Sequence, residues 1–267
     1  LTLTDKAGKT LWTAEKPLTA LESYVSAEIP GVKLWSAEEP NLYTLTVVLT
    51  NAQGQVTEVC RTKVGFRQFE MKDKIMCLNG KRIVFHGVNR HEFDCDRGRV
   101  MTHDLLMRDI RDMKAMNINA VRTCHYPNSR RFYELCDEIG ILVMSENNLE
   151  THGLATRVPR SNPQWTAECC YRVRNMVNSY KNHSCILFWS LGNESGNGNA
   201  FAEMKKEILK IDKTRPVHYE PDAKLKTSDL FSEMYTVQTA MKEIGENKPH
   251  VHSRALWNLG LGYHLKP

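Results

Sequence analysis

The sequence predicts an α/β protein in which a (β/α)8 TIM barrel, cut short after about six strands, follows a small β-rich module. Three observations lead to this fold. Residues 1–70 alternate polar and apolar side chains, the rest of the chain alternates short apolar runs with amphipathic stretches, and polar side chains follow almost every run. Functional groups behind many strands are typical of a barrel, whereas an open sheet gathers them at one switch point.

The composition is that of an ordinary globular protein. The 267 residues are 41% hydrophobic and 25% charged, which suffices for a substantial core. The net charge of +5 comes from 36 basic residues scattered among 31 acidic ones, so neither nucleic acid nor a membrane is expected as a partner. The N-terminal residues do not resemble a secretory signal, and the eight cysteines lack Cys-x-x-Cys spacing. We therefore expect reduced thiols in a cytoplasmic protein.

The β-rich module is clearest around residue 50. Apolar residues largely alternate with threonine over 43–50, and the turn-forming run 51–54 follows, as in one half of a β-sandwich. A further hairpin is expected where Asn79-Gly80 separates the β-rich runs 74–78 and 82–88, because Asn-Gly is the strongest short hairpin signal. We place the first domain at 1–72 and the barrel at 73–267.

Beyond residue 82, strands and helices are expected to alternate. The strands are expected at 83–85, 120–122, 141–144, 186–189, 216–219 and 230–235, with a further one at 249–255. The helices are expected near 104–116, 129–139, 164–180 and 199–211. Gly140 suits the left-handed residue that ends a helix, and Asn162 before Pro163 suits a helix start. Successive βα units predict a mainly parallel sheet.

The hexapeptide 190–195 follows the buried run 185–189 and contains a glutamate directly after an asparagine. Glu194 can protonate a glycosidic oxygen while the amide of Asn193 binds a neighbouring sugar hydroxyl. An equally simple interpretation is an acid in the first turn of a helix, where the helix dipole favours negative charge. The other strand ends favour the first interpretation.

A metal site is expected behind the preceding strand. Glu150 and His152 are two residues apart, so both side chains lie on the same side of an extended segment. With Glu194 from the next strand they form an oxygen-rich set that favours Mg²⁺ or Mn²⁺ over tetrahedral Zn²⁺. The alternative is a hydrogen-bonded Glu-His pair in a loop.

Two histidines follow the first two barrel strands. As neutral imidazoles, His91 and His125 can donate hydrogen bonds to sugar hydroxyls, although a single histidine at a strand end is more often structural. Phe188, Trp189 and a methionine stripe are interpreted as core. The stripe comprises Met101, Met107, Met113 and Met116.

Four motifs on successive strands resemble the β-galactosidases of glycoside hydrolase family 2. They are GVNRHE at 87–92, RTCHYPN at 122–128, NLETHG at 148–153 and WSLGNESG at 189–196. The segments KLWSAEEPNLYTL at 33–45 and VGFRQFE at 64–70 resemble the end of the immunoglobulin-like sandwich that precedes the barrel in this family, and SEMY at 232–235 resembles a later segment. The similarity extends over residues 20 to 250.

The resemblance implies a retaining glycosidase that releases terminal β-D-galactose. It implies Glu194 as the general acid/base, Tyr235 beside the reaction centre, and Mg²⁺ held by Glu150, His152 and Glu194. It further implies that His91, His125 and Asn193 bind the galactosyl group. The family also uses a monovalent cation, whose ligands are not expected in this chain, and forms homo-oligomers.

Two departures from the family pattern stand out. Ser145 occupies a position that is usually acidic, and we expect only local effects. Residues 247–267 contain no Asp or Glu, so the nucleophilic carboxylate that a retaining mechanism needs is not expected there. The alternative function is therefore an inactive truncated barrel that at most binds Mg²⁺ and galactosides. A glucuronidase is a third interpretation, against which no Arg/Lys cluster for a uronic carboxylate stands out.

Overall fold

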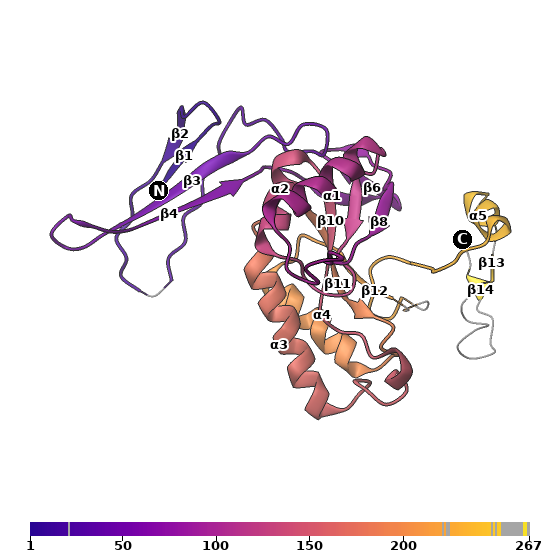
Figure 1. The fold of residues 1–267 in the computed structure, drawn as a ribbon. Helices are drawn as coiled ribbons and strands as arrows, with labels where there is room; N and C mark the ends of the chain where they lie inside the picture. Colours follow the sequence, from indigo (N-terminus) through magenta and orange to yellow (C-terminus); the bar gives the residue numbers. More distant parts are fainter. Residues whose placement is uncertain are drawn as a thin grey trace.

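The structure is a computed structural model that describes residues 1–20, 22–220, 222, 225–246 and 248, together with the backbone of 250–251 and 264–265. Figure 1 shows an antiparallel sheet at the N-terminal end and a parallel sheet flanked by helices in the middle. The helix α5 (Gln238–Gly245) is set apart from both, at the end of an extended segment.

The N-terminal sheet is antiparallel, with the strand order β2-β1-β3-β4. Its strands are β1 (Thr2–Thr4), β2 (Thr10–Thr13), β3 (Tyr43–Thr50) and β4 (Val56–Val64). The predicted turn joins β3 to β4: the Asn51 side-chain oxygen accepts from the backbone N–H groups of Gln53 at 3.0 Å and Gln55 at 2.9 Å. Such side-chain to backbone bonds explain why asparagine favours this turn.

A three-stranded antiparallel sheet follows the N-terminal one. It contains β5 (Phe69–Lys72), β6 (Ile75–Leu78) and β7 (Lys81–Arg82). Asn79 and Gly80 join β6 to β7 with φ values of 54° and 77°. Two successive positive φ angles are what a type I′ hairpin turn requires, so the predicted Asn-Gly hairpin is confirmed.

Five parallel strands form the sheet of the barrel domain. They are β8 (Gly87–Asn89), β9 (Ala120–Arg122), β10 (Leu142–Glu146), β11 (Ile186–Asn193) and β12 (Val217–Glu220). Each strand pairs with the one before it along the chain, in the order β12-β11-β10-β9-β8. A sheet without a reversal of strand order has no switch point, so it is of the barrel type rather than doubly wound.

The helices lie close to their expected positions. They are α1 (His103–Ala115), α2 (Arg130–Ile139), α3 (Pro163–Tyr180) and α4 (Asn199–Ile211). The Asn162 side chain accepts from the N–H of Gln164, with Pro163 in the first turn, as the sequence predicts for a helix start. Helix α1 packs on α2 and α3 on α4, as Figure 1 shows. Among the described residues, no helix combines the length and apolarity that crossing a bilayer requires.

Two expected strands differ from the structure. The first barrel strand occupies 87–89 instead of 83–85, because Ile83 still donates to the Met76 carbonyl at 2.9 Å and so continues the preceding hairpin. The prediction of a strand at 230–235 is wrong: Tyr235 has a φ of 58°, which no extended strand adopts. Of the strand expected at 249–255, His250–Val251 pairs antiparallel with His264–Leu265, and residues 252–255 lie outside the described residues.

One continuous core joins the barrel sheet to its helices and to the segment before β5. Phe188 and Trp189 are buried as expected, and so is Met113, whereas Met116 is 71% exposed because it caps the end of α1. The Trp35 indole N–H donates to the Asp137 carbonyl at 2.8 Å. This contact attaches the segment between the N-terminal sheet and β5 to helix α2.

Gly140 ends α2 at this junction, and replacing it with alanine is expected to destabilise the fold strongly. Its φ is +87°, and an added Cβ would lie 2.1 Å from the Ala37 carbonyl oxygen. The left-handed conformation costs alanine about 1–2 kcal/mol, and the clash adds about 1–3 kcal/mol. Urea unfolding measures the loss.

Gly80→Ala is the matched control, because its φ is +77° but an added Cβ meets nothing within 4 Å. We expect it to lose only the conformational part, about 1–2 kcal/mol. Equal losses in Gly140→Ala and Gly80→Ala would show that the contact between Gly140 and Ala37 has no energetic weight.

Candidate active site

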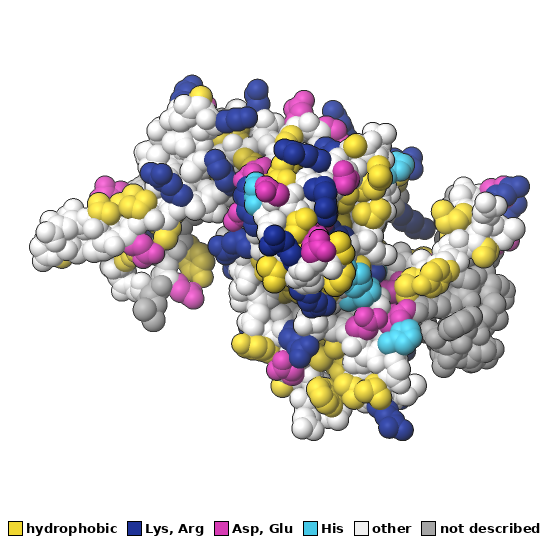
Figure 2. All heavy atoms as spheres, in the orientation of Figure 1, with side chains coloured by type: hydrophobic (Ala, Val, Ile, Leu, Met, Phe, Trp, Pro, Cys, Tyr) yellow, Lys and Arg dark blue, Asp and Glu magenta, His cyan; other side chains and the backbone are white. Residues whose placement is uncertain are grey.

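Polar side chains from all five parallel strands meet at one edge of the sheet, because the carboxyl ends of parallel strands point the same way. Figure 2 shows histidine and acidic side chains side by side on the face next to the segment that leads to α5. The site residues are best described as three groups. They are the acidic cluster Glu150, His152 and Glu194, the buried network around Glu146, and the histidines at the ends of β8 and β9.

The three residues of the acidic cluster lie close together, as the order of the strands predicts. One ligand atom each from Glu150, His152 and Glu194 lies within 4.8 Å of the others. His152 Nδ1 is hydrogen-bonded to a carboxylate oxygen of Glu194. His152 and Glu194 have positive φ values of 27° and 40°, an uncommon backbone conformation that often marks functional sites. Glu194 is largely shielded, with 14% of its side chain exposed, while 72% of the His152 side chain is exposed.

Asn193 connects this cluster to the rest of the site. Its Nδ2 donates to Glu150 Oε1 at 2.8 Å, and its Oδ1 accepts from Arg122 Nη2 at 2.9 Å. The Asn193 N–H donates to the Leu149 carbonyl at 2.8 Å, which extends the pairing of β10 and β11 toward the site. Both amide atoms therefore have protein partners, and the side chain is held in one orientation.

Glu146, at the end of β10, is the centre of the buried network. Its side chain is fully buried and accepts from Arg122 Nε at 2.6 Å and Nη2 at 3.0 Å. It also accepts from Ser190 Oγ at 2.6 Å, and His125 Nδ1 lies 2.6 Å from its other oxygen. Burial alone would raise the pKa of Glu146, but the His125 hydrogen bond and the Arg122 charge outweigh it and hold that pKa below its usual value. The carboxylate is therefore ionised and orients His125.

The network continues into the interior of the barrel. His218 lies between two hydroxyls, with Nδ1 3.1 Å from Ser190 Oγ and Nε2 2.9 Å from Ser232 Oγ. Ser232 Oγ donates to Glu220 at 2.5 Å. Burial lowers the pKa of His218 to about 4 and raises that of Glu220 to about 7. Near neutral pH His218 is therefore neutral, whereas Glu220 is poised to take up or release a proton.

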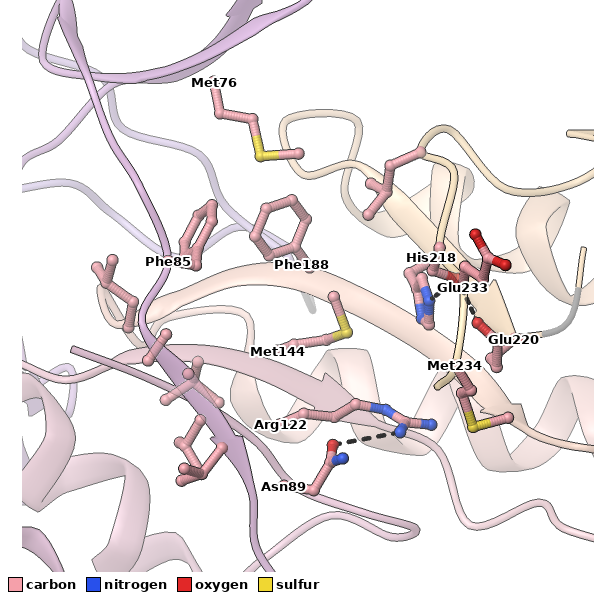
Figure 3. A pocket seen from close by; sticks show the side chains of 18 residues that line it. Met76, Phe85, Asn89, Arg122, Met144, Phe188, His218, Glu220, Glu233 and Met234 are labelled. Atoms are coloured by element: carbon pink, nitrogen blue, oxygen red, sulfur yellow. Dashed lines mark hydrogen bonds between the residues drawn. The ribbon is translucent and has the colours of Figure 1, made fainter. Parts of the chain in front are cut away.

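A cavity of about 350 Å³ lies along the inner face of the sheet. Figure 3 shows Phe85 and Phe188 at one end of it and Glu220 and His218 at the other. Arg122 points into the cavity between these ends and donates to Asn89 at 3.3 Å. The cavity is therefore apolar where the barrel core lies and polar toward the carboxyl ends of the strands.

The two predicted histidines lie together. The rings of His91 and His125 meet edge to face, with centroids 5.5 Å apart, and His91 Nδ1 lies 3.4 Å from the Tyr126 hydroxyl. Partial burial and the nearby His125 lower the pKa of His91, so its ring is neutral near pH 7.

Tyr235 does not lie with the other predicted residues in this conformation. Its side chain is 87% exposed, so the ring packs against little, although the preceding Met234 lines the cavity. Its role beside the reaction centre stays a prediction.

Sequence reasoning missed the residues that hold the site together: Glu146, Arg122, Ser190 and His218. Ser145, at the position that departs from the family pattern, points away from the site, and its hydroxyl lies 2.9 Å from that of the buried Tyr133. Glu146 ends an apolar run, and an acid there is almost never fully buried unless it is paired, but the run itself does not show which side of the strand Glu146 occupies. Arg122, also at a strand end, is that partner.

The fold and the site define a barrel domain that carries its polar groups at the carboxyl ends of the strands. The chain belongs to glycoside hydrolase family 2. A family model described as "Glycosyl hydrolases family 2, TIM barrel domain" matches residues 69–255, and one described as "Glycosyl hydrolases family 2" matches residues 1–67.

Several curated proteins are similar to the chain. The β-galactosidase of Clostridium acetobutylicum is 43% identical over 97% of this chain and 30% of its own length. That of Streptococcus thermophilus is 47% identical over 83% of this chain and 23% of its own length. The β-galactosidase large subunit of Lactobacillus acidophilus is 36% identical over the whole chain and 46% of its own length. The chain thus spans less than half the length of these relatives.

Solved structures agree on the fold. The β-glucuronidase of Parabacteroides merdae superimposes with a TM-score of 0.69 and 29% identity, over 82% of this chain and 28% of that one. A Ruminococcus gnavus β-glucuronidase in complex with D-glucaro 1,5-lactone gives a TM-score of 0.71 at 25% identity, over 81% of this chain and 37% of that one.

Proposed function

We propose that this chain carries the acid/base side of a retaining β-galactosidase site, which hydrolyses terminal non-reducing β-D-galactose residues. One observation carries the proposal: Glu194 lies at a strand end, held by His152 and next to Asn193, where a carboxylic acid can reach a glycosidic oxygen. The choice of galactose is supported by the 36–47% identity to proteins named β-galactosidases or β-galactosidase large subunits, against 29% or less for the glucuronidase structures.

In this proposal Glu194 gives its proton to the glycosidic oxygen as the bond to the leaving group breaks, and later takes a proton from the attacking water. Retention needs a second carboxylate about 5–5.5 Å away, to form the glycosyl-enzyme. Residues 247–267 contain no Asp or Glu, so we place that nucleophile outside this segment.

Sugar binding is proposed for His91, His125 and Asn193. His125 is oriented by its contact with Glu146, and Asn193 by Arg122 and Glu150. Groups held by such partners lose little freedom when the sugar binds, which favours tight and specific recognition. We place Tyr235 beside the reaction centre once the segment that carries it closes over the cavity.

We further propose that Glu150, His152 and Glu194 hold Mg²⁺ or Mn²⁺. The donor set fits a hard divalent ion, because two carboxylates and one imidazole converge and 72% of the His152 side chain is exposed, so water can complete the shell. When bound, the ion supplies positive charge that positions Glu194 and tunes its acidity.

Glu150→Gln is expected to weaken Mg²⁺ binding at least tenfold, because the substitution removes one of two anionic ligands. Isothermal titration of the 267-residue chain with Mg²⁺ measures the change. Glu168→Gln is the matched control, since Glu168 is an exposed acid whose hydrogen-bond partner is Arg172 on the same helix. Equal affinities in the wild type and Glu150→Gln would remove Glu150 from the metal role.

A further inference from the structure

A second group of metal-binding side chains lies at the ends of β8 and β9. Ligand atoms of His91, Cys124 and His125 all lie within 4.8 Å of one another. The group differs from the acidic cluster in chemistry, because it offers two nitrogens and one sulfur and no oxygen. It also differs in access: His91 is exposed, His125 is partly buried and Cys124 is 2% exposed, so the three residues lead from solvent toward the interior.

We propose that His91, Cys124 and His125 form a binding site for zinc or a similar transition-metal ion. Imidazole and thiolate are the ligands that zinc prefers, with bonds of about 2.0–2.1 Å to nitrogen and about 2.3 Å to sulfur. Two such ligands on one tetrahedral ion lie about 3.5 Å apart. Each pair of ligand atoms therefore has to approach by at most about 1.3 Å, a movement that rotation of the side chains allows. A water molecule takes the fourth coordination position.

The neighbours of both histidines direct the correct nitrogen toward the ion. His125 Nδ1 lies 2.6 Å from Glu146 Oε1, which leaves Nε2 for the metal. A carboxylate on the far nitrogen is the usual support of a metal-binding histidine, since it sets the tautomer and raises basicity. His91 Nδ1 lies 3.4 Å from the Tyr126 hydroxyl, which leaves Nε2 as the nitrogen that we assign to the metal.

The charges around the group permit a cation. Glu146 and Glu150 attract it, while Arg99 and Arg122 oppose it. Arg122 and Glu146 form an ion pair with an N–O distance of 2.6 Å, so their two charges largely cancel and Glu150 remains as the attracting charge. The Arg99 guanidinium lies over the Tyr126 ring, 4.1 Å from its centroid. On binding, the S–H bond of Cys124 breaks, a metal–sulfur bond forms, and the proton passes to solvent.

Another histidine-cysteine group in the protein is less suited to bind a metal ion. Asp137, His183 and Cys185 also lie within 4.8 Å of one another. There, however, Asp137 already binds both His183 Nδ1, at 2.6 Å, and the Cys185 N–H, at 2.7 Å, and no member of the group is exposed. An ion there would have to break these bonds, whereas the group that contains His91 has an exposed member that faces solvent.

The functional consequence rests on the proposed function. Because His91 and His125 are also the proposed sugar ligands, the ion and the galactosyl group exclude each other. The ion at this site is therefore inhibitory, in contrast to the ion proposed for Glu150, His152 and Glu194. A hard Mg²⁺ ion and a borderline Zn²⁺ ion then select different sites on the same face of the protein.

The test is titration of the 267-residue chain with Co²⁺, which takes zinc sites and produces a thiolate-to-cobalt absorption band in the near ultraviolet. The band is expected in the wild type with excess Mg²⁺ present. Cys124→Ser should abolish it, and His91→Ala should raise the Co²⁺ dissociation constant at least tenfold. His91 is exposed, so this second variant tests the site without disturbing the core. Cys95→Ser is the matched control, because Cys95 is an exposed thiol in another metal-capable group, with Asp94 and Asp96.

Absence of the band, its survival in Cys124→Ser, or its loss in Cys95→Ser would each overturn the proposal. Adding a galactoside to the cobalt-loaded protein tests separately whether the metal ion and the sugar compete for His91 and His125. Weakened Co²⁺ binding supports mutual exclusion. If galactoside leaves the band unchanged, the metal site stands, but the proposed sugar binding at His91 and His125 is contradicted.

Discussion

Glu194→Gln is expected to lower the turnover of a nitrophenyl β-galactoside by about 10²–10⁴-fold, the usual contribution of a general acid. Because we place the nucleophile outside residues 247–267, the measurement uses a longer chain. Residues 1–246 can replace the matching segment of the Clostridium acetobutylicum β-galactosidase, which is 43% identical to this chain. Glutamine keeps the shape and hydrogen-bonding capacity of Glu194 but has no acidic proton to give, so kcat falls in the chimera.

Glu168→Gln in the same chimera is the control, because this exposed acid on α3 contacts only Arg172 among the ion pairs of the described residues. It should leave the rate unchanged. The 267-residue chain alone is expected to act barely above background, because retention needs the second carboxylate. Robust turnover by that chain, lost in Glu194→Gln, would contradict this expectation and indicate another carboxylate or an inverting geometry.

Glu146→Ala is expected to lower the free energy of unfolding by about 3–5 kcal/mol. Its carboxylate is fully buried and is the acceptor for Arg122, His125 and Ser190. Removing it leaves the Arg122 charge largely buried without its partner, and an uncompensated buried charge costs more than a lost contact. Urea unfolding of the chain and the variant at neutral pH measures the difference.

The effect of Glu146→Ala should also depend on pH in a defined direction. The pKa of Glu146 is lowered from its usual 4.5 in the folded protein. Its stabilising contribution is therefore complete above pH 4.5 and disappears as the pH falls through the lowered folded pKa. The difference between wild type and variant should shrink over that range. A difference that is constant with pH would assign the loss to packing instead of charge.

Glu138→Ala is the matched control for this measurement. Glu138 also pairs with an arginine, Arg131, but both side chains are about 40% exposed. Exposed pairs contribute about 0–1 kcal/mol, so little change is expected. A loss in Glu138→Ala as large as in Glu146→Ala would show that burial of the Glu146 network has no special weight.

Sequence patterns predicted the structure correctly where interactions between neighbouring residues determine it. The start of α3 at Asn162 and Pro163, the end of α2 at Gly140 and the turn at Asn79-Gly80 depend on caps and φ angles that the residues themselves set. The segment 230–235 was predicted as a strand because short apolar runs have no distinctive period. Its conformation depends instead on contacts with β12, where Ser232 Oγ lies 2.9 Å from His218 Nε2 and 2.5 Å from a Glu220 carboxylate oxygen.

In the candidate site, too, some features follow from the sequence and others only from the tertiary structure. Motif order placed Glu194, Glu150 and His152 behind neighbouring strands, and parallel pairing then brings them together, so their convergence could be predicted from sequence. Glu146 is different. Nothing in the sequence around it distinguishes a fully buried acceptor for Arg122 from a solvated strand-end acid, because that depends on which side of β10 faces the barrel.

The sequence by itself thus determined the barrel class, the helices and which polar side chains follow the strands, because period, capping and residue type are local properties. The tertiary structure alone decided the partners: Glu146 with Arg122, and Cys124 with His91 and His125. It also decided that His218 is neutral and that Glu220 titrates near neutral pH, with a pKa of about 7. Burial and charge depend on residues brought together from different strands, and no single stretch of chain contains that information.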